Sequence, residues 1–203
     1  MIVIGLTGGI GTGKSEVARI LQDLGAVIIN ADQVGHQAYT PHTEAWEAVI
    51  KAFGQKIVDS SGEIDRKQLG AIVFSDPSHL ARLNQIMHPR MAGIVSEQIE
   101  SLKTDGVAVV VVEAAVLFEA GWDTLVDEVW TTESPLDSVA ERLMARNGFS
   151  REEVVKRMGS QMSAQERSDR AQVVVDNSGD VGSLEDTIRS LWENRVRERV
   201  GKV

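Results

Sequence analysis

Two kinds of hydrophobic pattern alternate at the start of the chain. Residues 2–6 form a continuous apolar run that ends in glycines, which is typical of a strand buried on both faces of a sheet. Residues 13–24 place apolar side chains at helical spacing, and Gly25 suits the position just after a helix end. Residues 26–30 form a second apolar run. The order strand, glycine-rich loop, helix, strand predicts a βαβ unit and therefore a parallel sheet.

The rest of the chain continues the alternation, with a long helical stretch in the middle. Runs rich in β-branched residues predict strands at 107–112, 127–131 and 172–176. The spacing predicts helices over residues 43–53, 66–74, 76 to about 102, 134–147 and 183 to about 197. Ser150 and Glu153 have the spacing of a capping box, which marks a further helix start. The whole pattern predicts an α/β fold.

Composition narrows the class of protein without identifying it. A chain of 203 residues with 42% hydrophobic and 25% charged residues is expected to form one globular domain. The formal net charge of −9 argues against a nucleic acid or an anionic membrane as partner. The absence of cysteine excludes disulfides and thiol chemistry and is compatible with the cytoplasm. No signal-peptide pattern or membrane-length apolar run is seen, so we expect a soluble protein.

Residues 8–15 carry the clearest chemical motif. Their sequence, Gly-Gly-Ile-Gly-Thr-Gly-Lys-Ser, matches the phosphate-binding pattern G-x-x-x-x-G-K-[ST] at every fixed position. Such glycines let successive backbone N–H groups point at a phosphate, and the following helix adds its positive N-terminal end. We expect Lys14 to neutralise the β- and γ-phosphates of ATP and the Ser15 hydroxyl to ligate Mg²⁺. The residues expected to bind ATP here are Gly8, Gly9, Ile10, Gly11, Thr12, Gly13, Lys14 and Ser15.

Asp32 follows the second predicted strand. Ligands of open parallel sheets bind at the C-terminal ends of the strands, so this carboxylate is expected to face the phosphates. It could accept the proton of a substrate hydroxyl and help to position Mg²⁺. The alternative is that Asp32 only caps a helix beginning near Gln33, although the two roles are compatible.

Basic residues gather in residues 142–170. This segment contains seven Lys or Arg and four Asp or Glu, a positive excess in an acidic chain. A lid that closes basic side chains over ATP would need this bias. A solvated helix face with ordinary ion pairs is the alternative. Arg142 is the stronger candidate for a phosphate contact, because it lies one turn before Arg146 on the helix that enters the segment.

These motifs, in their order and spacing, resemble the dephospho-CoA kinase family over nearly the whole chain. The matching segments are residues 6–15, 30–34, 88–89, 117–119, 142–146, 157–161 and 175–179. Two departures stand out. The family usually has Asp-Ala-Asp where this chain has Asn30-Ala31-Asp32. The role of the first acid is therefore in doubt in this chain, whereas the second acid is present as Asp32. Bacterial members commonly carry a proline in the segment that is here residues 114–116.

The resemblance implies transfer of the ATP γ-phosphate to the ribose 3′-hydroxyl of dephospho-CoA, giving coenzyme A and ADP, the last step of coenzyme A biosynthesis. It implies a P-loop NTPase fold with a five-stranded parallel sheet in a single domain, residues 1–203. The expected parts are a core (about 1–35, 105–145 and 171–203), a helical acceptor-binding insertion (about 36–104) and a lid (about 146–170). We expect a cytoplasmic protein that is a monomer or a weak homo-oligomer.

By position, the resemblance assigns Asp32 as general base and makes Lys14 and Arg142 catalytic contacts of the transferring phosphate. It adds Arg146 to the ATP contacts and assigns Ser15 and Asp32 to Mg²⁺. The residues expected near the acceptor are Asp32, His88, Leu117 and Glu119, although a lone histidine is more often structural. Two alternatives stay open: a P-loop kinase for another nucleoside or nucleotide, and a non-catalytic protein that binds nucleotide.

Overall fold

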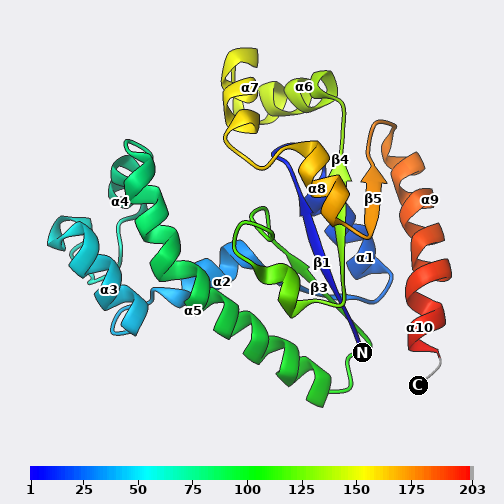
Figure 1. Cartoon of the computed structure of the whole chain (residues 1–203), viewed down its shortest axis with the longest axis horizontal. Helices are drawn as coiled ribbons and strands as arrows, with labels where there is room; N and C mark the ends of the chain where they lie inside the picture. The colour runs from blue at the N-terminus through cyan, green and yellow to red at the C-terminus, as the bar shows by residue number, and fades with distance from the viewer. Residues whose placement is uncertain (202–203) are drawn as a thin grey trace. The chain divides into compact units, whose positions relative to one another are not determined.

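The computed structural model describes residues 1–201 and contains a five-stranded sheet in the order β2–β3–β1–β4–β5 (Figure 1). β1 pairs in parallel with β3 and β4, and β4 pairs in parallel with β5. The predicted parallel sheet of five strands is therefore confirmed. The strands are β1 (Ile2–Gly8), β2 (Val27–Asn30), β3 (Val109–Glu113), β4 (Glu128–Glu133) and β5 (Val173–Asp176).

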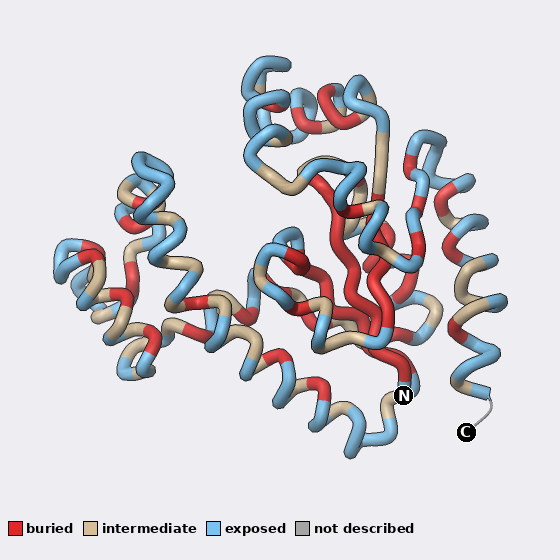
Figure 2. The backbone as a smooth tube through the Cα atoms, in the orientation of Figure 1, coloured by how far each residue is buried: buried red, intermediate tan, exposed pale blue. Residues whose placement is uncertain are grey.

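Burial explains why the sequence marks some strands more clearly than others. Every residue of β1 and β3 is buried, which accounts for their continuous apolar runs. β5 lies at the edge of the sheet and alternates, with Val174 and Asp176 exposed. Figure 2 shows the strands of the sheet mostly in red, whereas the helices alternate between red, tan and pale blue along their length.

Most of the helices follow the predicted spacing with shifts at their ends, whereas the helix at Ala164–Arg170 was not predicted. They are α1 (Lys14–Asp23), α2 (Ala31–Ala38), α3 (Glu44–Phe53), α4 (Arg66–Val73), α5 (Pro77–Thr104), α6 (Leu136–Asn147), α7 (Arg151–Gly159), α8 (Ala164–Arg170), α9 (Val181–Leu191) and α10 (Glu198–Val200). The capping box of Ser150 and Glu153 is present at the start of α7. The predicted C-terminal helix begins earlier, because Asp180 caps α9, and it passes into a π-helical turn at Trp192–Arg197.

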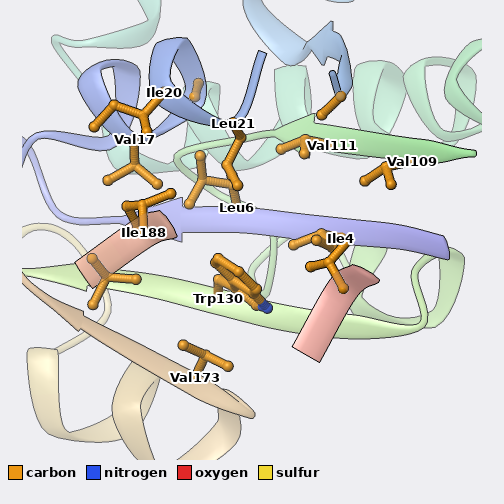
Figure 3. Close-up of a cluster of buried hydrophobic side chains, with 14 of the residues drawn as sticks. Ile4, Leu6, Val17, Ile20, Leu21, Val109, Val111, Trp130, Val173 and Ile188 are labelled. Atoms are coloured by element: carbon orange, nitrogen blue, oxygen red, sulfur yellow. The ribbon is translucent and has the colours of Figure 1, made fainter. Parts of the chain in front are cut away.

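The chain divides into two compact units, and each is described by itself. The first comprises residues 1–29 and 99–201. Its main core lies between the sheet and the helices α1 and α9, where Leu6 and Trp130 of the sheet pack with Leu21 and Ile188 (Figure 3). This packing fixes the end of β1 against the start of α1, which is where the phosphate-binding motif lies.

The second unit comprises residues 30–98 and is helical. Its core contains Val49 and Phe53 of α3, Leu69 of α4 and Met87 of α5. The helices α3 and α4 are capped by the side chains of Thr43 and Asp65. Short helices that are marginal alone are thus stabilised by their caps and by one shared apolar cluster.

Candidate functional site

The motif at residues 8–15 forms the turn between β1 and α1. β1 ends at Gly8, Gly13 is the N-cap residue, and Lys14 and Ser15 form the first turn of α1. Within the described residues, no side chain caps the start of α1. The side chains that cap other helix starts belong to Asn30, Thr43, Asp65, Ser150, Ser163 and Asp180. The first N–H groups of α1 therefore remain available to an anionic ligand.

Distant side chains set the shape of this loop. Asn177, after β5, donates from Nδ2 to the carbonyl oxygen of Thr12 at 2.9 Å. The Thr12 hydroxyl lies 2.7 Å from that of Thr132 and donates to the carbonyl oxygen of Gly9. Gly13 has φ 97°, and a Cβ on it would overlap the amide nitrogen of Asn177. Glycine is required at position 13 both by the backbone conformation and by the close approach of Asn177.

Ser15 is placed beside a carboxylate that the sequence analysis did not single out. Its hydroxyl donates to Oε1 of Glu113 at 2.9 Å. Glu113 is buried at the C-terminal end of β3, next to Leu6 of β1 in the sheet register. In the sequence, the only indication of this role is that Glu113 directly follows the apolar run of residues 107–112. The position matters for the loop because β3 pairs with β1. Hydroxyl and carboxylate oxygens are donors that suit Mg²⁺.

Arg142 and Arg146 lie on α6 and differ in their contacts. Arg142 Nη1 donates to the Ser134 hydroxyl at 3.1 Å, and Nη2 donates to the carbonyl oxygen of Asn177 at 3.0 Å. Since Asn177 also bonds to Thr12, Arg142 is joined to the loop through one residue. Arg146 is exposed and donates to the side chain of its neighbour Asn147. Among the described residues, Arg142 is thus bonded to the supports of the loop, whereas Arg146 bonds to its neighbour Asn147.

Asp32 belongs to the second unit, in the first turn of α2. The cap of α2 is Asn30, whose Oδ1 accepts the backbone N–H groups of Asp32 and Gln33. The interpretation of Asp32 as the cap of a helix beginning near Gln33 is therefore wrong. Asp32 is exposed, and Asn30 caps α2 in its place.

The remaining acceptor candidates lie in different surroundings. Leu117 is fully buried, and its side chain occupies the space that a Cβ on Gly5 would need. Glu119 is exposed and accepts the N–H of Met162 at 3.4 Å. His88 is half-buried on α5 in the second unit. Leu117 is buried and packs against β1, whereas Glu119 presents a carboxylate at the surface.

The predicted lid segment contacts the loop in this structure. Gln161 Oε1 accepts the N–H of Ile10 at 2.9 Å. Arg167 lies against Gly9 and forms an ion pair with Glu133, with 3.6 Å between Nε and Oε1. Burial raises the pKa of the Glu133 carboxyl above its ordinary value, and the positive charge of Arg167 acts in the opposite direction. Gln161 lies in the matching segment 157–161 and Arg167 in the basic segment 142–170, but neither was named as a site residue from the sequence.

Two further properties of the described residues concern metal-binding clusters and membrane-spanning helices. No cluster of three or more His, Asp or Glu side chains suited to a metal is present in residues 1–201. Over the same range, none of the helices has the length and apolar character required to cross a bilayer.

Known proteins similar to this chain cover nearly all of it. A family model described as dephospho-CoA kinase matches residues 2–183. A dephospho-CoA kinase of Geobacter sulfurreducens is 45% identical over 195 residues, covering 96% of this chain and 99% of that relative. A crystal structure from Thermus thermophilus has a TM-score of 0.79 at 33% identity, covering 96% of this chain and 97% of that one. A dephospho-CoA kinase structure from Campylobacter jejuni has a TM-score of 0.73 at 25% identity, with 97% and 98% covered.

Proposed function

Because the chain belongs to the dephospho-CoA kinase family, we propose that it transfers the γ-phosphate of ATP to the ribose 3′-hydroxyl of dephospho-CoA. The products are coenzyme A and ADP, so the reaction completes coenzyme A biosynthesis. The observation that carries the proposal is the uncapped start of α1 behind the loop at residues 8–15, in a chain whose family similarity extends from residue 2 to residue 183. Such a helix start binds phosphate through backbone N–H groups.

The loop residues hold the donor. The N–H groups of the glycines and of the first turn of α1 bind the phosphate oxygens, and the Lys14 ammonium neutralises the β- and γ-phosphates. Arg142 would leave its bonds to Ser134 and Asn177 to meet the transferring phosphate, or would act by keeping Asn177 against Thr12. Phosphoryl transfer depends mainly on such positioning and charge.

Asp32 is the proposed general base. Its carboxylate takes the proton of the acceptor 3′-hydroxyl as that oxygen attacks the γ-phosphorus and ADP leaves. The proposal is supported by its place directly after β2, since parallel sheets bind ligands beyond the carboxyl ends of their strands. It is also supported by Asn30, which leaves the Asp32 carboxylate unused by the helix cap. We propose that His88 and Glu119 also contact the acceptor, with Leu117 as the apolar residue of the Glu119 motif.

Mg²⁺ is the proposed cofactor, and the oxygens of Ser15 and Glu113 fit it. Ser15 would bind the ion directly, and Glu113 and Asp32 would orient its ligands. When bound, the ion neutralises charge on the phosphates of ATP. Oε1 of Glu113 accepts the hydrogen bond of the Ser15 hydroxyl and so orients that oxygen.

The remaining assignments follow from the reaction. ATP and dephospho-CoA are small-molecule partners, and neither nucleic acid nor membrane is proposed. We place acceptor binding in the helical insertion (about 36–104) and closure over ATP in the lid (about 146–170). The cytoplasm is the proposed compartment, which a chain without cysteine suits. A monomer or a weak homo-oligomer is the proposed assembly state.

The test is an assay of ADP release with Mg²⁺ and ATP, run with and without dephospho-CoA. We expect release to depend on dephospho-CoA and the product to carry a 3′-phosphate. A panel of nucleosides and mononucleotides is the control. Faster turnover of any of them than of dephospho-CoA would refute the assignment, as would ATP binding without transfer to any acceptor.

A further inference from the structure

Arg167 on α8 is a buried cation beside the phosphate-binding loop. Only 5% of the residue is exposed, although arginine is seldom buried unless it is paired. Its nitrogen Nη2 lies against Gly9, since a Cβ built on Gly9 would come within 3.0 Å of it. The guanidinium therefore covers the loop backbone at a position where glycine leaves room for it.

The charge of Arg167 is incompletely compensated within the protein. The 3.6 Å between Nε and Glu133 Oε1 exceeds hydrogen-bond distance, and Nε is buried without a hydrogen-bond acceptor among the described residues. Nη1 donates to the carbonyl oxygen of Met162. Burying a charged group whose N–H lacks a hydrogen-bond acceptor lowers the stability of the fold. The stability of the fold therefore does not explain an arginine at this position.

Gln161, in the same segment, holds the next residue of the loop. It accepts the N–H of Ile10 from a position 151 residues further along the chain. The Ile10 side chain packs against an apolar cluster that includes Val139, Leu143 and Val154. Gly9 and Ile10 are thus fixed from outside the loop, whereas the first turn of α1 is left open.

We propose that Arg167 is a positioning residue for nucleotide phosphates, which holds Gly9 in place and adds a fixed positive charge beside the N–H groups of the loop. The ligand class is a nucleoside polyphosphate, whose negative charge compensates the buried cation. The inference rests on the proposed function, because it takes the loop to bind ATP. A fixed charge in a site with little water stabilises an anion more than the same charge in water does. The competing interpretation is that Arg167 only stabilises the packing of α8 on β4.

The test compares Arg167→Met with Arg170→Met. Both variants remove one cation from α8 by the same substitution, but Arg170 lies over the Phe118 ring and pairs with Asp123. Calorimetric titration with ATP gives the Kd of each folded variant. We expect Arg167→Met to raise the Kd by about 10- to 10²-fold and Arg170→Met by less than about twofold. Unfolding midpoints without ATP separate the two interpretations, since a purely structural residue would lower the midpoint and leave the Kd unchanged.

Equal ATP affinity in the two folded variants would overturn the inference. If Arg167→Met does not fold, Arg167→Lys decides, because lysine keeps the charge but cannot cover Gly9 while donating to Met162. We expect its Kd to rise about fivefold, and wild-type affinity in Arg167→Lys would also refute the positioning role. The titration needs no acceptor. A wild-type protein that binds ATP but does not phosphorylate dephospho-CoA would therefore refute the proposed function and leave this inference intact.

Discussion

The loop region of the first unit and the helical second unit are stabilised by different kinds of contact. Residues far away in the sequence hold the loop, as Asn177 holds Thr12 and Gln161 holds Ile10. In the second unit, helix starts are held by residues next to them, such as Thr43 and Asp65. We therefore expect changes at the supports of the loop to alter nucleotide binding, and changes at the caps of the second unit to alter stability.

Asp32→Asn is the strongest test of this comparison, because Asp32 lies in the second unit and is proposed to act in the reaction. Turnover should fall by about 10²- to 10⁴-fold, the usual contribution of a positioned base, while the Kd for ATP stays near wild type. Steady-state kinetics and ATP titration measure the two effects.

Asp65→Asn is the matched control for this variant. It makes the same chemical change in the same unit, and asparagine also caps helices, so α4 should keep its start. Wild-type turnover in Asp65→Asn together with a large loss in Asp32→Asn would support the base assignment. Turnover of Asp32→Asn within a few-fold of wild type would remove Asp32 from the mechanism.

Gly13→Ala should have the next largest effect. The new Cβ would overlap the Asn177 amide on a backbone with φ 97°, so the loop must shift. We expect the Kd for ATP to rise by about tenfold or more, since a shift of about 1 Å in a positioning group is costly. ATP titration measures the change.

Gly25→Ala is the control for backbone strain alone. Gly25 follows the other end of α1 with φ 110°, and no atom of residues 1–201 beyond its chain neighbours lies within 4 Å of a Cβ built there. Its free energy of unfolding should fall by about 1–2 kcal/mol, with ATP affinity unchanged. Equal Kd values in the two variants would show that Asn177 does not control the shape of the loop.

The same division explains which features could be predicted from the sequence. The loop motif consists of consecutive residues, and the buried strands β1 and β3 are visible in the sequence as apolar runs. The capping box at Ser150 is also local and was predicted correctly. Features that depend on one short stretch of chain can therefore be predicted from the sequence.

Contacts between distant segments were not accessible in this way. Glu113 becomes relevant only because β3 lies next to β1, and Arg167 only because α8 brings it to Gly9. The misassigned cap of α2 differs, since Asn30 is as good a cap residue as Asp32 and the sequence alone does not choose the helix start. The roles assigned to Asp32 and Arg146 stay predictions.

Thr43→Ala should change stability without changing the reaction. Its hydroxyl accepts the N–H of Trp46 at 3.2 Å at the start of α3, and losing such a cap costs about 1 kcal/mol. Chemical denaturation measures the loss, and turnover well below the unfolding midpoint should stay at the wild-type value. Thr43→Ser, which keeps the hydroxyl, should restore stability. A loss of turnover in folded Thr43→Ala would break the distinction between the two regions.

The smallest expected effect is the pH dependence of the capped helices. Hydrogen bonds from backbone N–H groups lower the pKa of the Asp65 and Asp180 carboxyls below the ordinary value. The largest contribution comes from the N–H of Gln68 for Asp65 and from the N–H of Ser183 for Asp180. A carboxyl with a lowered folded pKa stabilises the protein above its unfolded pKa and ceases to do so as pH falls through the folded pKa. Stability should therefore decline below about pH 4, where unfolded carboxyls begin to bind protons.

Glu133, near the loop, should act with the opposite sign. Burial raises the pKa of this carboxyl, so its contribution to stability is greatest below the unfolded pKa and is lost as pH rises through the folded pKa. Unfolding midpoints measured across the acid range distinguish the contribution of Glu133 from that of Asp65 and Asp180, because the two contributions change with pH in opposite directions. Asp65→Asn and Asp180→Asn, which retain a capping oxygen without a titrating group, should lose less stability than wild type below about pH 4. Identical acid profiles in these variants and in wild type would mean that the caps do not set the acid stability.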